Sequence, residues 1–377
     1  MIKVFYWAPF ISKIATPKAV INSAISLNKY SNKKIQPSII NLFGEWDFFL
    51  DDQKKHNLNF LNLFSKIQLL NLPDNGFFLS RISFAFIFLK SFFPLLKLLK
   101  KEKPNYLIIH LNTSLPLFLL IFFNFNTKFV LRISGKPRLN FLRTMLWKIA
   151  SKKLYKVTAP TKLIYEDLLQ RKIFIKEKLH ILYDPVIVLD KFKKINTMPT
   201  IYGKYLVAAG RLTKQKNFEF LINCFVNINK KYDNFKLIIL GDGDQKEMLS
   251  MMIKEKNLEK KVFLLGYKKN ILEYLRKSYC FILSSLWEDP GFVLIESAMT
   301  NTIILSSNCD SGPKDFLKNG INSFVYQSNN RKSFLDTFDN FLNTEEAERY
   351  KMKISMKRSI KKFTMFNHYK NLEKIIL

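Results

Sequence analysis

Short apolar runs rich in β-branched and aromatic residues alternate with longer helix-type patterns along most of the chain. In the first half this pattern predicts strands at residues 2–6, 36–42, 66–71, 106–111, 128–133, 154–159 and 180–183. In the second half it predicts strands at residues 205–210, 236–241, 261–265, 279–283, 302–306 and 322–326. Such alternation is typical of parallel α/β sheets, in which a helix connects each strand to the next. We therefore predict an α/β fold.

The alternation stops between about residues 185 and 203, where the sequence is polar and has no period. A chain of 377 residues is also too long for one ordinary core and long enough for two. We predict an N-terminal Rossmann-like domain at 1–190, a C-terminal Rossmann-like domain at 191–355 and a final helical segment at 356–377.

Helix starts are indicated at three places. Thr16 and Pro17 have the order of a helix cap and a first-turn proline, and a second helix is expected from about residue 217. A third is expected from Asp244, which has capping-box spacing to Glu247. We therefore expect Asp244 to cap this third helix.

Two apolar stretches need to be compared with a membrane span, which takes about 20 consecutive apolar residues. Residues 104–127 are divided by polar residues and predict a buried strand followed by a core helix. Residues 77–103 predict a basic amphipathic helix whose Lys90, Lys97 and Lys101 share one face, with Pro94 expected to bend or break it. We expect this helix to lie on an anionic membrane surface; the alternative is a core helix with lysines extending to solvent.

The formal net charge of +31 predicts attraction to polyanions, either nucleic acid or an anionic membrane. The alternative is that many lysines only solvate the surface. Three widely spaced cysteines, Cys224, Cys280 and Cys309, indicate neither a disulfide framework nor a zinc site, and they favour a reducing cytoplasm. The start, MIKVFYWAPF, lacks a basic segment and a cleavage site, so we expect a first strand and no secretory signal.

Three loops that follow predicted strands carry candidate chemistry. After the strand at 205–210, Arg211 and Lys216 precede a helix, where two cations suit a diphosphate. After the next strand, the sequence GDGD lacks the third glycine of a dinucleotide fingerprint, which disfavours a nicotinamide site. Its Asp242 and Asp244 resemble a metal-binding pair, but a cap at Asp244 is the more economical interpretation.

The third loop reads WEDPGFVLIE at residues 287–296. Glu288 is predicted in the loop and Glu296 about one and a half turns into a helix. The amides of Gly291, Phe292 and Val293 would point out of the helix start and attract an anion. Two carboxylates beside an anion site suit a nucleotide sugar, because carboxylates accept hydrogen bonds from hydroxyl groups. The alternative is an ordinary acidic first turn of a helix.

These segments resemble the retaining GT-B glycosyltransferases of glycosyltransferase family 4. The resemblance rests on GRLTKQKNFEFLINCF, LIILGDGDQKEML, VFLLGY, SSLWEDPGFVLIESAM and SGPKDFLKNGINSFVY, in the family's order across roughly residues 180–360. PNYLIIHLNTS, KVTAPTKLIYEDL and ILYDPV extend it more weakly over the first half. It implies two Rossmann-like parallel-sheet domains that face each other across a cleft, with a tail that crosses back onto the first domain.

The resemblance also implies roles for individual residues. Glu288 matches the glutamate on the donor sugar and Glu296 the one on the ribose. Arg211 and Lys216 match the pair on the donor diphosphate, which implies catalysis without a metal or another cofactor. The segment from Leu265 to Tyr267 would line the nucleotide base. His110 matches a histidine that faces the sugar; considered alone, it is more often a packed side chain.

Three departures from the family pattern stand out. The stretch PFISKIATPK has no glycine where the family often has a glycine-rich loop. The stretch VLRISGKP has no second histidine, so Arg132, Ser134 or His110 would replace the family's usual catalytic one. Asn217 stands where glycine is usual.

The sequence thus predicts a retaining hexosyltransferase that uses a UDP- or GDP-sugar and a lipid-linked, lipopolysaccharide or surface-polysaccharide acceptor. We expect it at the inner face of a bacterial cytoplasmic membrane, held there through 77–103, and we expect no nucleic-acid partner. One alternative is a nucleotide-sugar epimerase of the same fold. A basic nucleic-acid-binding protein is the other, although no recognition module supports it.

Overall fold

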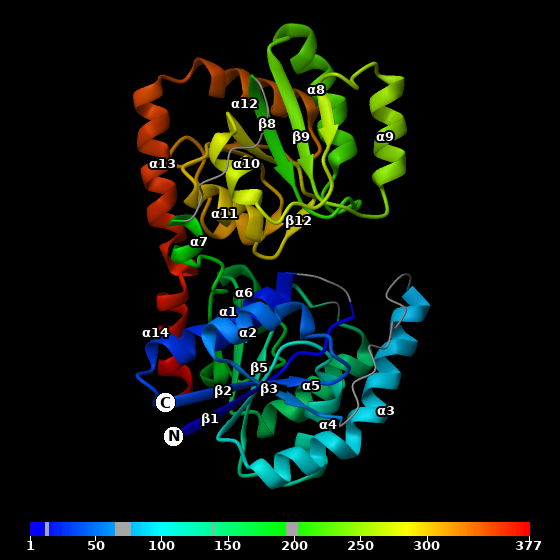
Figure 1. Cartoon of the computed structure of the whole chain (residues 1–377), viewed down its shortest axis with the longest axis vertical. Coiled ribbons are helices and arrows are strands. Elements are labelled where there is room, and N and C mark those ends of the chain that lie inside the picture. Colours follow the sequence, from blue (N-terminus) through cyan, green and yellow to red (C-terminus); the bar gives the residue numbers. More distant parts are fainter. Residues whose placement is uncertain (12–14, 65–76, 138, 194–202) are drawn as a thin grey trace. The chain divides into compact units, whose positions relative to one another are not determined.

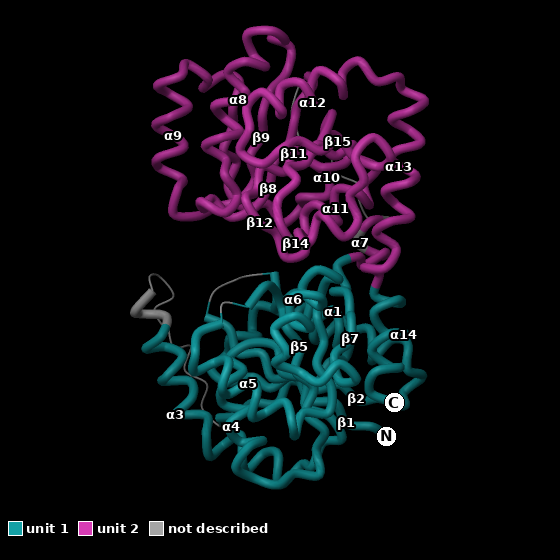
Figure 2. The backbone as a smooth tube through the Cα atoms, turned by 180° about the vertical axis from the view of Figure 1, so that it is seen from behind, with its two compact units in different colours: residues 1–186, 365–377 teal, residues 187–364 magenta. Residues whose placement is uncertain are grey.

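The computed structural model describes residues 1–11, 15–64, 77–137, 139–193 and 203–377 (Figure 1). The predicted strand at 66–71 lies outside these residues. The chain forms two compact units, one of residues 1–186 and 365–377 and the other of residues 187–364 (Figure 2). The units therefore divide at 186/187, close to the predicted 190/191. The return to unit 1 falls at 364/365, later than the predicted 355/356.

Unit 1 contains a seven-stranded parallel sheet of order β3-β2-β1-β4-β5-β6-β7. Its strands are β1 (Ile2–Trp7), β2 (Ile35–Asn41), β3 (Asn59–Asn62), β4 (Tyr106–Ile109), β5 (Lys128–Arg132), β6 (Lys156–Ala159) and β7 (Leu179–Ile181). The strands β4 and β5 are aligned so that Ile109 lies opposite Leu131. Consequently, the residues that follow these two strands lie next to each other at the carboxyl edge of the sheet.

The helices of unit 1 join these strands and cover the sheet. They are α1 (Ala15–Tyr30), α2 (Leu50–His56), α3 (Phe77–Glu102), α4 (Ser114–Phe122), α5 (Phe141–Lys153), α6 (Lys162–Gln170) and α14 (Met365–Ile376), with short 3₁₀ turns at Asp47–Phe49 and Lys176–Lys178. Helix α14 comes from the far end of the chain and packs beside α1 (Figure 1). The tail thus completes the first unit.

Unit 2 contains a six-stranded parallel sheet of order β10-β9-β8-β11-β13-β15. Its strands are β8 (Lys204–Ala209), β9 (Phe235–Leu240), β10 (Val262–Leu264), β11 (Cys280–Leu283), β13 (Ile304–Ser307) and β15 (Phe324–Tyr326), with β12 (Trp287–Glu288) paired to β14 (Asp310–Ser311) beside them. Its helices are α7 (Leu189–Lys193), α8 (Phe218–Lys231), α9 (Lys246–Glu255), α10 (Ile271–Lys277), α11 (Phe292–Met299), α12 (Arg331–Asn343) and α13 (Glu346–Ile360), with 3₁₀ turns at Gly312–Asp315 and Lys361–Phe363.

Each unit buries a hydrophobic core of its own. The central strands are apolar on both sides, and every residue of β4 is buried, because helices cover both faces of a parallel sheet. Helix α8 instead buries one face, with Phe218, Leu221, Ile222, Phe225 and Ile228 at helical spacing. These two patterns explain why the sequence predicts strands and helices with different periods.

Pro94 was predicted to bend or break helix α3, and the helix continues through this residue, so no break occurs there. Its ribbon changes direction along its length (Figure 1). One side of the helix joins the core through Ile87, Leu95 and Leu99. The part Arg81–Glu102 is long and apolar enough to cross a membrane by length and composition alone, yet 28% of its apolar stretch is buried inside the unit. The core contacts make α3 a structural part of unit 1.

The start of α9 also corrects a prediction. The N-cap of this helix is Gln245, and Asp244 precedes it in a turn. Asp242 accepts a hydrogen bond from the Gly243 amide at 2.9 Å and pairs with Lys246 at 3.3 Å. The capping-box spacing was therefore misleading, since the loop places the carboxylate of Asp242 beside the helix start.

Candidate active site

The candidate active site of unit 2 lies where β8, β9, β10 and β11 end. The loop after β8 is fastened to the loop after β11, because Leu286 donates its amide to the Gln215 carbonyl at 2.8 Å and Ser284 Oγ donates to the Lys216 carbonyl at 2.7 Å. Gln215 Nε2 in turn donates to the carbonyl of Trp287 at 2.9 Å. The two loops that carry the predicted site residues are thus held together by one backbone hydrogen bond and two hydrogen bonds from side chains to backbone carbonyls.

Lys216 and Glu288 meet at this junction. Lys216 Nζ forms an ion pair with Glu288 Oε1, and only 14% and 6% of the two side chains are exposed. Ser285 Oγ donates a second hydrogen bond to the same carboxylate oxygen at 2.6 Å. The family resemblance implied that Lys216 binds the donor diphosphate and Glu288 the donor sugar, whereas the structure shows that the two side chains bind each other. A shielded pair of this kind holds both side chains in fixed positions.

Helix α11 starts at the same place. Its N-cap is Gly291, whose φ of 89° is a left-handed conformation that favours glycine. The amides of the first turn, from Phe292 onward, have no partner within the helix. Glu296, on the next turn, is 94% buried at 6% exposure. A Cβ on Gly291 would lie 3.6 Å from Glu288 Oε2, so Glu288 lies at the start of α11, and Glu296 follows about one turn along the same helix.

Two glycines allow the backbone segments around this site to approach each other closely. A Cβ on Gly241, whose φ is 139°, would lie 1.8 Å from the carbonyl oxygen of Gly210. A Cβ on Gly312 would similarly lie 2.3 Å from Cα of Pro290. Only glycine permits these approaches. The loops after β8 and β9 fit together because Gly210 and Gly241 have no side chains, and Gly312 likewise allows the backbone to approach Pro290.

We expect Gly241→Ala to lower the free energy of unfolding of unit 2 by at least about 2 kcal/mol, because the methyl group collides with backbone atoms and the φ is left-handed. Urea denaturation followed by circular dichroism measures the change. Gly320→Ala is the matched control, since Gly320 has a φ of 70° but no atom within 4 Å of an added Cβ. Equal losses for the two variants would show that φ strain, and not the close approach, is responsible.

The remaining predicted residues of unit 2 are more exposed. Arg211 is exposed at the start of its loop, Tyr267 is 69% exposed, and Leu265 is partly buried. Among the described residues, no cluster of three or more metal-ligand side chains is found. The hydroxyl of Thr213 and the Oε1 of Gln245 are buried without a hydrogen-bond partner, and sequence reasoning missed both. The only feature of the sequence that could have indicated these two residues is their position in the loops that follow β8 and β9.

His110 follows β4 at the carboxyl edge of the unit 1 sheet. It is 4% exposed, its two ring nitrogens have no hydrogen-bond partner, and its ring centroid lies 5.9 Å from that of Tyr6. Burial lowers the pKa of His110 well below its ordinary value, and the charge of Arg132 lowers the pKa further. The imidazole is therefore neutral near pH 7 and keeps both a donor and an acceptor unused.

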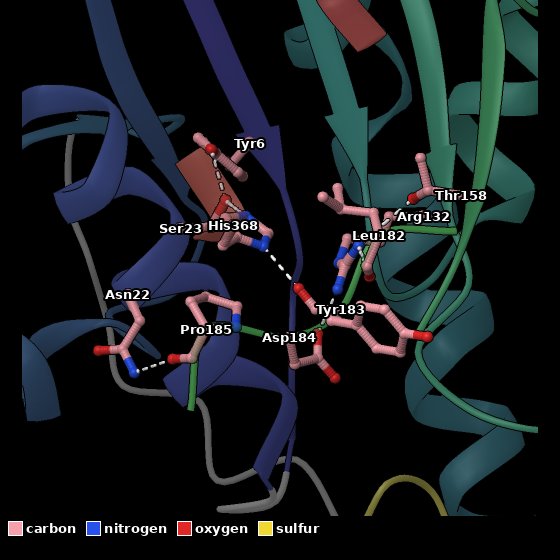
Figure 3. Close-up of polar contacts among 10 residues, drawn as sticks. All are labelled: Tyr6, Asn22, Ser23, Arg132, Thr158, Leu182, Tyr183, Asp184, Pro185 and His368. Atoms are coloured by element: carbon pink, nitrogen blue, oxygen red, sulfur yellow. Dashed lines mark hydrogen bonds and ion pairs between the residues drawn. The ribbon is translucent and has the colours of Figure 1, made fainter. Parts of the chain in front are cut away.

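Arg132 does not have a free guanidinium. It forms a buried ion pair with Asp184 and donates to the Leu182 carbonyl at 3.0 Å and to Thr158 Oγ1 at 3.4 Å (Figure 3). The idea that Arg132 replaces a catalytic histidine is therefore disfavoured by these contacts. Ser134 differs, because its hydroxyl is buried and lacks a hydrogen-bond partner, and the same holds for the side-chain nitrogen of Asn112, which follows β4.

A second set of contacts joins this edge to the tail of the chain. His368, on α14, bonds through Nε2 to Ser23 Oγ at 2.8 Å and through Nδ1 to the Tyr183 carbonyl at 2.7 Å, while Ser23 bonds to the Tyr6 hydroxyl at 2.9 Å (Figure 3). Burial lowers the pKa of His368 to about 3. Sequence reasoning missed Asp184 and His368, because their partners are far away in the chain.

Solved structures identify the class of fold. The crystal structure of a glycosyltransferase from Rickettsia africae superposes with a TM-score of 0.77 at 16% identity, covering 99% of this chain and 97% of that one. HepE from Anabaena, solved in complex with UDP and glucose, superposes with a TM-score of 0.72 at 12% identity, covering 99% of both chains. The fold is of the GT-B type with two parallel-sheet α/β units, which confirms the predicted fold class.

Sequence comparison then points to a family. Residues 198–358 match the family model of glycosyl transferases group 1. An uncharacterized glycosyltransferase of Methanocaldococcus jannaschii is 34% identical over 62% of this chain and 62% of its own length. The N-acetylgalactosamine-N,N'-diacetylbacillosaminyl-diphospho-undecaprenol 4-alpha-N-acetylgalactosaminyltransferase of Campylobacter jejuni is 30% identical over 50% of this chain and 51% of its own length. Each match spans less than two thirds of the relative, and together they confirm the resemblance to glycosyltransferases.

Proposed function

We propose that the protein is a retaining glycosyltransferase that moves a hexose-type sugar from a UDP- or GDP-sugar to a hydroxyl group of a lipid-linked or surface-polysaccharide acceptor. The observation that carries the proposal is that Lys216 pairs with Glu288 beside the start of α11, the helix that also carries the buried Glu296. The family match over residues 198–358 covers this same edge. Relatives whose names specify lipid-linked acceptors supply the acceptor class.

In this proposal the donor diphosphate lies against the amides at the start of α11, where the helix dipole and unpaired N–H groups favour an anion. Arg211, exposed at its loop, and Lys216, paired with Glu288, add positive charge. Glu296 accepts hydrogen bonds from the ribose and Glu288 from the transferred sugar. Tyr267 and its neighbours line the base.

The reaction breaks the bond between the anomeric carbon and the donor phosphate oxygen and forms a bond from the acceptor oxygen on the same face of the sugar. The acceptor proton passes to the departing phosphate. Lys216, Arg211 and the α11 amides stabilise the negative charge on that phosphate, so that no metal ion is required for this role. Neutral His110 in unit 1 is assigned to a hydroxyl of the transferred sugar, since its ring has an unused donor and acceptor.

Product analysis tests the reaction. The protein is incubated with UDP-glucose, UDP-N-acetylglucosamine, UDP-galactose or GDP-mannose and an undecaprenyl-diphosphate-linked acceptor, and NMR records the anomeric configuration of the product. Retention of the α configuration supports the proposal. Inversion would contradict the retaining mechanism. A change of the nucleotide sugar without an acceptor would instead establish the epimerase alternative.

We place the protein at the inner face of a bacterial cytoplasmic membrane through α3. Its outer side supports this position: Ile82, Leu89 and Phe93 are 63%, 73% and 74% exposed, beside exposed lysines. The opposite side is held in the core of unit 1, so a helix that lies in the headgroup plane accounts for the exposed side without unfolding the unit.

We expect replacement of Lys90, Lys97 and Lys101 by glutamate to abolish flotation of the protein with anionic liposomes. Each lysine near an anionic surface contributes about 1 kcal/mol of attraction, and each glutamate adds repulsion. Flotation in a sucrose gradient at physiological salt measures the bound fraction. Replacement of the exposed Lys246, Lys254 and Lys332 of unit 2 by glutamate makes the same change in net charge and serves as the control. Equal flotation of wild type and the α3 variant would rule this helix out.

A further inference from the structure

Helix α5 presents a row of apolar side chains to solvent. Phe141, Leu142, Met145 and Ile149 are 80%, 73%, 51% and 43% exposed, and their spacing places them along one side of the helix. The opposite side buries Trp147, Ala150 and Ser151. Asn140 fixes the helix start by accepting the amide hydrogen of Arg143 at 2.9 Å. The row is therefore held outward by a well-anchored helix, and no packing contact within the described residues of unit 1 explains why it is apolar.

Positive charge surrounds this row. The exposed cations of α5 are Arg143, Lys148, Lys152 and Lys153. Glu102 is the only acidic residue in the sequence between positions 75 and 165. A helix side that only needed to be soluble would normally mix charges of both signs. The exposed side of α5, which is apolar and flanked by cations, instead matches a partner surface with negative charge on its outside and an apolar layer below it.

Helix α5 is connected to α3 through α4. The helices α4 and α5 pack together, and Phe118 of α4 contacts Phe88 and Phe92 of α3 with ring centroids 5.8 and 6.0 Å apart. Figure 2 shows α3, α4 and α5 next to one another in unit 1. Phe122, at the end of α4, is 65% exposed. The exposed side of α5 therefore belongs to the same helical layer as the exposed side of α3.

We infer that α5 is a second membrane-contacting element, and that its apolar row inserts at the boundary between headgroups and acyl chains of an anionic bilayer. This inference extends the membrane position given under the proposed function and does not depend on the sugar that is transferred. Insertion removes four large apolar side chains from water, and the flanking cations contact lipid phosphates. A second copy of the chain is a poor occupant, because it would bring like charges together. Nucleic acid would leave the apolar row in water.

A fluorescent label tests insertion directly. The three cysteines of the protein are buried, and burial raises the pKa of their thiols, so a cysteine introduced at the surface reacts selectively. Met145→Cys is labelled with an environment-sensitive dye, and Met251→Cys, at a site 60% exposed on α9, is the matched control. We expect dye emission to rise and shift to the blue at position 145 alone when phosphatidylglycerol vesicles are added. No shift at position 145 would overturn the inference.

Flotation of the full chain gives an independent measurement. We expect Phe141→Ser, Leu142→Ser and Met145→Ser together to reduce partitioning onto phosphatidylglycerol vesicles by about tenfold or more. The control replaces Met251, Ile321 and Tyr350 of unit 2 by serine, at sites 60%, 58% and 64% exposed, and should leave partitioning unchanged. Unchanged binding of the α5 variant would sink the inference. Two other results would also contradict it. One is a wild-type protein that is a dimer in analytical ultracentrifugation and an α5 variant that is a monomer. The other is an α5 variant that loses RNA binding and keeps vesicle binding.

Nucleotide-sugar binding separates the two proposals. The α5 variant should keep the thermal stabilisation by nucleotide sugars of the wild-type protein, because the changed side chains lie outside the donor site. If vesicle binding is lost and this stabilisation remains, the surface assignment is supported by itself. If neither protein is stabilised by any nucleotide sugar, the proposed function fails, whereas the vesicle measurements still decide the role of α5.

Discussion

Glu296→Ala is expected to abolish the thermal stabilisation of the protein by its nucleotide-sugar donor. A ligand at 100 times its dissociation constant stabilises the folded state by about 2.7 kcal/mol, and this stabilisation requires the ribose contacts assigned to Glu296. Differential scanning fluorimetry with the donor panel measures the shift. The melting temperature without ligand should change far less, because alanine is a good helix former at this position of α11.

Two further variants make this result specific. Glu247→Ala removes an exposed glutamate from α9 in the same unit and should keep the full ligand shift. Glu296→Gln keeps the size of the buried side chain and removes only its charge, so it distinguishes a lost ligand contact from damage to the fold. A large fall in the melting temperature without ligand for both Glu296 variants would indicate that this side chain is structural.

Asp184→Ala is expected to lower the free energy of unfolding by about 3–5 kcal/mol, because it leaves the guanidinium of Arg132 buried without its carboxylate. Only 2% of Arg132 and 6% of Asp184 are exposed, so water cannot replace the lost partner. Urea denaturation with a unit 1 probe, such as fluorescence of the fully buried Trp7, measures the loss.

The control for this variant is an ion pair at the surface. Asp167→Ala removes the partner of Arg171 on α6, where the side chains are 41% and 26% exposed, and should cost less than about 0.5 kcal/mol. Replacing Arg132 by methionine together with Asp184 by leucine should recover most of the stability, because the buried charge is then gone. A loss below about 1 kcal/mol for Asp184→Ala would show that the buried pair matters little.

Most of the fold was predictable because its strands are continuous apolar runs. The predicted strands at 205–210 and 236–241, for example, correspond to β8 and β9 within one residue at each end. Among the described residues, the strands that the sequence did not indicate are β3, which has four residues of which two are asparagine, and the two-residue strands β12 and β14. Their pairing depends on tertiary contacts and not on local pattern.

The site was predictable only in part, for a related reason. Position in a loop after a strand located Lys216 and Glu288 correctly at one edge of the sheet, yet it gave no sign that they pair with each other. The role of Arg132 likewise depends on Asp184, which lies on a different strand connection. His368 reaches the same region from the end of the chain. Such long-range contacts leave no period in the sequence.

The position of α14 has a consequence for biosynthesis. Residues 365–377 supply a helix and a buried histidine to a unit whose other residues end at Val186. Residues 1–186 therefore lack a part of their own unit until residues 365–377 have been made, whereas residues 187–364 contain the whole of the second unit. A chain released after Thr364 would hold all the residues of the second unit and leave uncovered the surface of α1 that α14 contacts.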